Sequence, residues 1–138
     1  MQHRKARTVG IDHVGLSVGD LERSRRFFVE CLGWEVVGAK PDYPAVFVSD
    51  GATRLTLWEV DKSGGYVLFD RRKNVGLHHL ALKVPDVAAL QETFLRVSNW
   101  PGVEVEFAPE SALGGSRTHC MVREPGGVRV EFVCTGDG

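Results

Sequence analysis

The sequence has little of what disulfide-stabilised, membrane-spanning or nucleic-acid-binding proteins need. Its 138 residues include only three cysteines, Cys31, Cys120 and Cys134, an odd number without metal-type spacing, which favours a reducing compartment. No apolar run approaches the roughly 18 residues of a membrane helix, and none follows the basic N-terminus as a secretory signal requires. The formal net charge of −1 gives no attraction to nucleic acid or anionic membranes. We therefore expect a cytoplasmic protein that binds neither.

What remains is an ordinary globular composition. Hydrophobic residues make up 43% and charged residues 25% of the chain. A chain of this length is most simply one domain, here residues 1–138. It buries enough surface to form a hydrophobic core without disulfides or a structural metal.

The chain contains an internal sequence repeat. Residues 9–21 read VGIDHVGLSVGDL and residues 75–87 read VGLHHLALKVPDV. In this alignment His79 falls on His13 and Asp86 on Asp20. Both stretches alternate as a strand does and then reach an aspartate suited to cap a helix.

Each unit predicts the order β-α-β-β-β, with modules at 9–61 and 75–134. The first has strands at 11–18, 34–37, 45–49 and 54–60 and a helix that Asp20 caps and Gly33 ends. The second has strands at 77–84, 103–107, 119–122 and 128–133 and a helix at 87–97 with Leu90, Phe94, Leu95 and Val97 inward. We expect an α+β fold in which the modules form a curled mixed sheet with the helices on its outer face.

Three side chains are candidates for a metal site on the concave face of this sheet. His13 and His79 occupy matched strand positions, and Glu131 falls on Thr56 when the last strands are aligned on Gly51 and Gly126. Two imidazoles and one carboxylate suit a divalent Fe, Mn, Ni, Zn or Co ion with positions left for substrate. The alternative is that these are half-buried structural residues; an unpartnered buried carboxylate is costly, which favours the metal.

Other residues have weaker assignments. Trp58 and Phe47 line the concave face or belong to the core, and His119 contacts substrate or faces away. Alternation places His78 towards the helix layer, and Glu59 is the alternative ligand if the strand register differs by one residue. The basic run at 71–73 is solvated surface or, alternatively, an anion site.

The sequence resembles the vicinal oxygen chelate superfamily in four segments, DHVGLSVGDLERSRRFF, LGWEVV, HHLALKVPDV and EPGGVRVEF. This superfamily includes glyoxalase I, methylmalonyl-CoA epimerase, extradiol dioxygenases, fosfomycin-resistance thiol transferases and bleomycin-resistance proteins. The resemblance covers Val9 to Val133. It implies ligand positions at His13, Thr56, His79 and Glu131. Thr56 departs from the Glu of glyoxalase I and the Gln of the epimerase, so the remaining set looks more like the thiol transferases and dioxygenases. Val122 and Arg123 stand where the extradiol signature has Tyr, which counts against ring cleavage.

The resemblance also implies a mechanism and an assembly. A bound metal acts as a Lewis acid on a substrate that chelates it through adjacent oxygens, and Glu131 holds the ion or moves a proton. Relatives of this size pair as homodimers, which puts His13 of one chain beside His79 and Glu131 of the other.

Three functions follow as hypotheses. The first is a metal-dependent enzyme of the glyoxalase type that acts on a small oxygenated metabolite or thiol adduct. The alternative is a metal-free protein of the bleomycin-resistance type that holds an aromatic antibiotic between Trp58, Phe47 and the Tyr43 loop, which Thr56 in a ligand position favours. The third is a structural or regulatory module with neither property.

Overall fold

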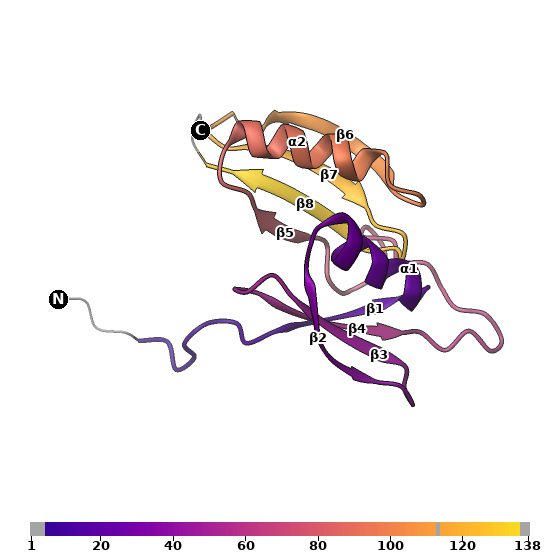
Figure 1. Cartoon of the computed structure of the whole chain (residues 1–138). Helices are drawn as coiled ribbons and strands as arrows, with labels where there is room; N and C mark the ends of the chain where they lie inside the picture. The colour runs from indigo at the N-terminus through magenta and orange to yellow at the C-terminus, as the bar shows by residue number, and fades with distance from the viewer. Residues whose placement is uncertain (1–4, 113, 136–138) are drawn as a thin grey trace.

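The computed structural model describes residues 5–112 and 114–135 (Figure 1). The first module consists of β1 (Val14–Val18), α1 (Leu21–Arg26), the π-helical turn η1 (Phe27–Cys31), β2 (Glu35–Lys40), β3 (Ala45–Ser49) and β4 (Arg54–Glu59). The second consists of β5 (Leu80–Lys83), α2 (Val87–Ser98), β6 (Glu104–Ser111), β7 (Thr118–Arg123) and β8 (Arg129–Cys134). No helix among the described residues is long and apolar enough to span a membrane.

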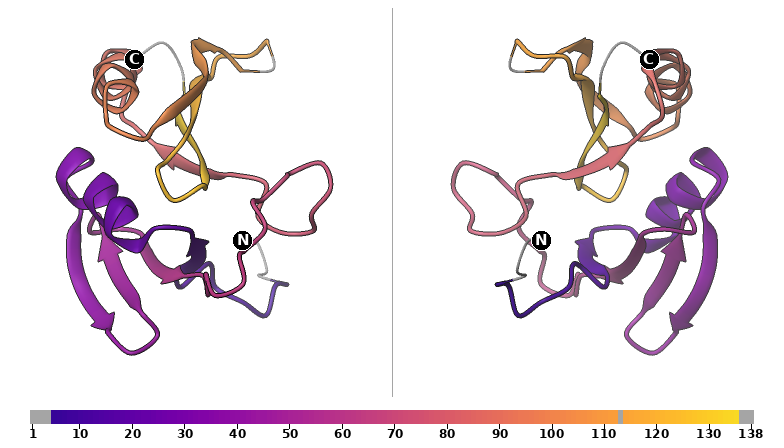
Figure 2. Two further views of the ribbon diagram at one scale, coloured as in Figure 1. Left: turned by 90° about the vertical axis from the view of Figure 1, so that its right-hand side faces the viewer. Right: turned by 90° about the vertical axis from the view of Figure 1, so that its left-hand side faces the viewer.

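The strands form two four-stranded mixed sheets with the same topology. Their orders are β1-β4-β3-β2 and β5-β8-β7-β6, and in each the first strand runs parallel to the last and lies at the edge. The expected α+β fold of two β-α-β-β-β modules is therefore confirmed. Figure 2 shows both helices on the same side of the molecule, which leaves the opposite sheet faces uncovered.

The helices begin at the predicted aspartates. The side chain of Asp20 accepts a hydrogen bond from Arg23 N, and that of Asp86 accepts one from Ala89 N. These contacts satisfy backbone donors that have no partner inside a helix. The first helix widens into η1 before Gly33, whose φ of 81° is a conformation that favours glycine.

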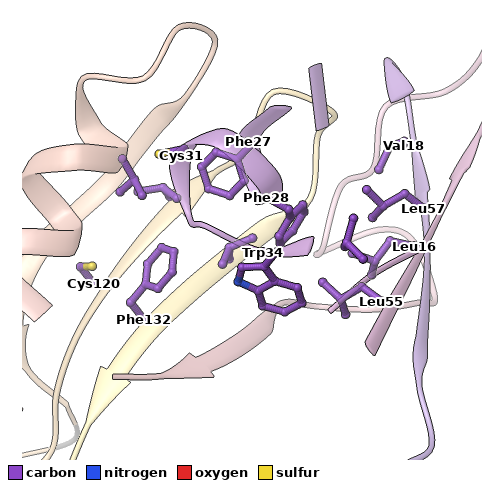
Figure 3. Packing of buried hydrophobic residues seen from close by; sticks show 14 of the residues in the cluster. Leu16, Val18, Phe27, Phe28, Cys31, Trp34, Leu55, Leu57, Cys120 and Phe132 are labelled. Atoms are coloured by element: carbon purple, nitrogen blue, oxygen red, sulfur yellow. The ribbon is translucent and has the colours of Figure 1, made fainter. Parts of the chain in front are cut away.

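A single hydrophobic cluster joins the two modules. Phe27, Phe28 and Trp34 of the first module lie in the same cluster as Cys120 and Phe132 of the second (Figure 3). The backbone of the first helix region is also held by α2, because the guanidinium of Arg96 donates to the carbonyl oxygens of Cys31 (2.5 Å) and Glu30 (3.1 Å).

A buried carboxylate fastens the turn before β8 to α1. Glu124 is 1% exposed, and its Oε1 accepts from Ser24 Oγ (2.7 Å) and Gly126 N (2.9 Å), while its Oε2 accepts from Val128 N (2.9 Å). Burial raises its pKa above the ordinary carboxyl value, although these hydrogen bonds act in the opposite direction. The contact with Ser24 links the second module to the first.

Several predicted boundaries were wrong. The strands expected at 11–18 and 77–84 begin only at Val14 and Leu80, because the residues before them have no strand beside them in the described chain. The strand expected at 103–107 extends to Ser111 across two register shifts. Leu95, expected to face inward, is 64% exposed, since Leu90 and Val97 define the buried side of α2.

Candidate functional site

His79 and Glu131 lie together on the uncovered face of the second sheet. Glu131 is on β8, where Val130 and Phe132 point into the core and Glu131 points the other way. His79 directly precedes β5, the parallel neighbour of β8. The Nε2 of His79 is 3.1 Å from the Oε1 of Glu131, and their side chains are 35% and 14% exposed. The two groups are therefore close enough to bind one ion and open enough for a ligand to reach them.

His119 completes this group from the neighbouring strand. Its Nδ1 is 2.5 Å from the Oε2 of Glu131, and its side chain is 18% exposed. Phe107 packs against its ring with the centroids 4.7 Å apart. A carboxylate only accepts hydrogen bonds, so the imidazole nitrogen that faces Oε2 is the donor. Of its two expected orientations, His119 takes the one towards the candidate site.

His13 does not reach this group within the chain. It directly precedes β1, as His79 precedes β5, and its Nδ1 is 2.7 Å from the Oδ2 of Asp12. The side chains of His13 and Asp12 are 50% and 90% exposed. The hydrogen bond to His13 lowers the pKa of Asp12 below its ordinary value. The two repeated histidines thus occupy matched places on different modules.

Thr56 lies on the uncovered face of the first sheet, but its hydroxyl is already engaged. Trp58 Nε1 donates to Thr56 Oγ1 at 2.8 Å, and Thr56 is 6% exposed. Gly15 is the register partner of Thr56, and a Cβ added there would lie 3.1 Å from the same oxygen. The small residue on β1 makes room for this pair.

Aromatic side chains gather beside Thr56. The ring centroids of Tyr43 and Trp58 are 4.6 Å apart, those of Phe47 and Trp58 are 5.8 Å apart, and the guanidinium carbon of Arg54 lies 5.7 Å from the centroid of Phe47. Phe47 is the register partner of Thr56 across β3 and β4. The uncovered face of the first sheet therefore offers an aromatic surface rather than metal donors.

His78 was expected in the helix layer, and this prediction was wrong. It is exposed, with its Nδ1 2.8 Å from the Nδ1 of His79, and its carbonyl oxygen accepts from the Arg129 guanidinium at 3.0 Å. Desolvation and the charge of Arg129 lower the pKa of His78. Residues 75–79 are not in a strand, so alternation does not decide which way their side chains point. The Arg129 guanidinium also forms an ion pair with Glu106, in which the nearest nitrogen and oxygen are 2.6 Å apart.

The remaining candidates have other partners. Glu59 Oε2 accepts from Leu21 N at 2.9 Å and lies 3.6 Å from Lys62 Nζ, so this carboxylate supports the start of α1. In the linker, Arg71 and Arg72 line a hollow of about 550 Å³ together with Arg123 of β7 and Asp70. Whether this surface is merely solvated or binds an anion stays a prediction.

A larger cleft, about 570 Å³, lies between the modules and beneath the linker. Its walls come from β1, from linker residues that include Tyr66 and Phe69, and from the turn at 124–129. Glu124 is part of this wall, but both of its oxygens are already bonded. His79, His119 and Glu131 do not line this cleft, so the candidate donors and the cleft are separate features of the chain.

The donors present fit part of a metal site. Within residues 5–112 and 114–135, no three His, Cys, Asp or Glu side chains are arranged to hold a metal ion. His79 Nε2 and Glu131 Oε1 are two donors of suitable type at contact distance on one face, and further ligands have to come from elsewhere.

A sequence profile identifies the family. The Glyoxalase/Bleomycin resistance protein/Dioxygenase superfamily profile matches residues 10–132, which is nearly the whole chain. The chain belongs to this superfamily. The resemblance seen in the repeated strand motifs is thereby confirmed, and so is the fold that it implies.

Individual relatives of this superfamily member are distant. Lactoylglutathione lyase of Haemophilus influenzae is 29% identical over 132 residues, which cover 88% of this chain and 89% of the relative. A glyoxylase/bleomycin resistance protein/dioxygenase domain from Frankia sp. EAN1pec has a TM-score of 0.77 at 25% identity, with 95% of each chain covered. A mutant of the fosfomycin resistance protein FosX from Listeria monocytogenes, crystallised with Mn(II) and a dihydroxypropylphosphonic acid, has a TM-score of 0.72 at 18% identity and covers 95% of this chain and 94% of its own.

The chain spans only 44% and 26% of two other curated relatives that it matches, a putative lactoylglutathione lyase of Brassica oleracea and a catechol-2,3-dioxygenase of Bacillus subtilis. These names differ in the reaction they describe, so superfamily membership leaves the activity to be proposed.

Proposed function

We propose that this protein is a metal-dependent enzyme of the glyoxalase type, whose site combines His79 and Glu131 of one chain with His13 of a second copy. The observation that carries the proposal is the 3.1 Å approach of His79 Nε2 to Glu131 Oε1 on an uncovered sheet face. Two metal-type donors are in place there, and the repeat-related histidine is on the surface of the other module. A homodimer supplies the missing donor.

Unpaired strand edges support this assembly. β1 and β5 each form one edge of their sheets, and within the described residues the segments directly before them have a strand pattern but no strand partner. Val9, Ile11 and Val75 in these segments are 87%, 84% and 106% exposed. Exposed apolar side chains beside an open strand edge favour pairing with another strand, and a two-fold axis satisfies both edges at once.

The chemistry of the site follows from its donors. When bound, a divalent ion polarises a substrate that chelates it through two adjacent oxygens. His79 and Glu131 would hold the ion, and the aromatic surface around Trp58 would form an apolar wall for the substrate. Thr56 supplies no carboxylate base, because its side chain carries only a hydroxyl, and this hydroxyl accepts a hydrogen bond from the Trp58 indole. We therefore favour a substrate that is a small oxygenated metabolite or thiol adduct.

Metal analysis of protein purified without chelator or histidine tag tests the proposal. We expect about one divalent ion per chain, with candidates Fe, Mn, Ni, Zn and Co, and its loss in Glu131→Gln and His79→Ala. Glu92→Gln is the matched control, because Glu92 is an exposed carboxylate on α2. Wild-type protein that remains metal-free after incubation with all five ions would contradict the proposal.

The aromatic surface favours a second candidate, a metal-free protein that binds an aromatic antibiotic. Tyr43 is 60% exposed beside Trp58, so its ring is accessible to a planar ligand. Under this alternative, metal-free protein is stabilised against heat by aromatic antibiotics, and Trp58→Ala abolishes that stabilisation. An unchanged melting temperature with such ligands would remove this candidate.

A further inference from the structure

We propose that His119 is a positioning residue, which holds one oxygen of Glu131 so that the carboxylate offers only its other oxygen to a metal. This inference rests on the proposed function. His119 is not one of the candidate metal ligands His13, His79 and Glu131 that the repeated sequence indicates. His119 has no counterpart in the matched histidine pair, since it comes from β7 rather than from the start of a module.

The strand register places His119 beside Glu131 without a turn or a flexible loop. β7 and β8 are antiparallel, with Glu131 opposite Met121 and His119 opposite Val133. His119 and Glu131 are thus diagonal neighbours on one face, within reach of each other's side chains. Phe107 of β6 packs on the imidazole at a centroid distance of 4.7 Å and restricts its rotation. A donor held in this way stays in place when a ligand arrives.

The two oxygens of Glu131 have different partners. Oε1 faces His79 Nε2 at 3.1 Å, and Oε2 faces His119 Nδ1 at 2.5 Å. An ion bound to His79 Nε2 and Oε1 replaces only the first contact. The second contact keeps Oε2 turned away, so Glu131 binds through one oxygen and leaves a coordination position for the substrate. Hydrogen bonds that orient ligating groups in this way commonly change metal affinity about 10- to 100-fold.

The surroundings of His119 separate this role from a packing role. Cys120 and Val122, its neighbours on β7, are fully buried on the opposite face of the sheet. His119 itself is 18% exposed, and Phe107, which packs on its ring, is not among the members of the hydrophobic cluster of the two modules. Replacement of its ring therefore removes its contacts with Glu131 and Phe107 and leaves the fully buried side chains of the cluster in place.

Calorimetric titration of metal-free protein with Zn(II), Mn(II) or Co(II) tests the inference. We expect His119→Ala to weaken metal binding by about 10-fold or more. His119→Asn should bind within about threefold of wild type, because its side-chain amide offers an N–H near the position of Nδ1. Thr118→Ala, next along β7, is the control and should bind as wild type does. Circular dichroism establishes that each variant is folded.

Two further readouts separate positioning from stability. The visible spectrum of the Co(II) protein should change in His119→Ala, as Glu131 becomes free to bind through both oxygens, and should return in His119→Asn. In metal-free protein, the Nδ1 proton of His119 should resonate far downfield and disappear in Glu131→Gln.

The outcomes are distinct. Wild type that binds none of the five candidate ions, Fe(II), Mn(II), Ni(II), Zn(II) and Co(II), overturns the proposed function and this inference together. Wild-type affinity and an unchanged Co(II) spectrum in His119→Ala overturn the inference alone, as does a folded His119→Asn that binds no better than His119→Ala.

Discussion

The Nε2 of His79, which directly precedes β5, lies 3.1 Å from the Oε1 of Glu131 on the parallel strand β8. Both belong to the second module, while the matched His13 lies at the edge of the first. If two copies associate edge to edge, each copy contributes half of two equivalent sites.

Mixing two inactive variants tests whether the sites are shared between subunits. His13→Ala and Glu131→Ala should each lose the metal as homodimers. After subunit exchange, about half of the dimers contain one of each, and each mixed dimer has one intact site, so about one quarter of the wild-type metal content should return. Metal analysis after gel filtration measures this. No recovery in dimers shown by mass to be mixed would mean that His13 acts within its own chain or not at all.

Glu124→Gln should destabilise the protein because the buried carboxylate accepts three hydrogen bonds. An amide offers one acceptor oxygen and places an NH₂ against the N–H of Val128. The unsatisfied donor costs about 1–3 kcal/mol in the free energy of unfolding. Urea unfolding measures it, with the exposed Glu92→Gln as control.

The difference in the free energy of unfolding between wild type and Glu124→Gln should depend on pH. Burial raises the folded pKa of Glu124 above the ordinary 4.5. Its contribution to stability is therefore fully present below the unfolded pKa and is lost as the pH rises through the folded pKa. The stability gap between wild type and Glu124→Gln should narrow as the pH rises above 4.5. A gap that widens over this range would contradict the assignment.

Gly126→Ala should disrupt the junction between the modules. A Cβ at this position would overlap Ser24 Oγ, and it would lie 2.8 Å from the Cβ of Val18 and 2.9 Å from Oε2 of Glu124. We expect a loss of about 1–3 kcal/mol or more, as in overpacked cores. Gly115→Ala is the control, because its nearest contact is an ordinary 3.8 Å and no strain arises. Thermal unfolding compares the two, and equal melting temperatures would refute the steric argument.

The three cysteines should be unreactive in the native protein. Cys31, Cys120 and Cys134 are buried, and burial raises the pKa of Cys120 to about 11 and that of Cys31 above its ordinary value. At neutral pH these two thiols are protonated, and the thiolate is the reactive form. Ellman's reagent should therefore react slowly with native protein and titrate three thiols after denaturation. Rapid reaction of one thiol without unfolding would show that its site opens.

Some features followed from local sequence pattern. The similarity of residues 75–87 to residues 9–21 predicted the two modules, and the capping residues Asp20 and Asp86 predicted where both helices begin. The alternation of β8 correctly separated Val130 and Phe132 from Glu131. These features depend on neighbours along the chain, so a periodicity of two or a single capping residue is enough to predict them.

Other features depended on which strands lie beside one another. The sequence left both orientations open for His119, because alternation along one strand does not say which of its faces is covered. The contact with Glu131 arises from the pairing of β7 with β8, and that with Phe107 from β6, whose register shifts near Phe107 have no local signal. His78 was misplaced because its segment is not a strand at all.

The sequence by itself determined the duplicated fold and the chemical types of the candidate donors, His13, His79 and Glu131. Only the tertiary structure decided which donors meet within one chain: His79 and His119 meet at Glu131, and His13 remains at the edge of the other sheet. The physical reason is that side-chain type and face are local properties of a strand, whereas a distance between strands is set by register and by the packing of the two modules on a common core.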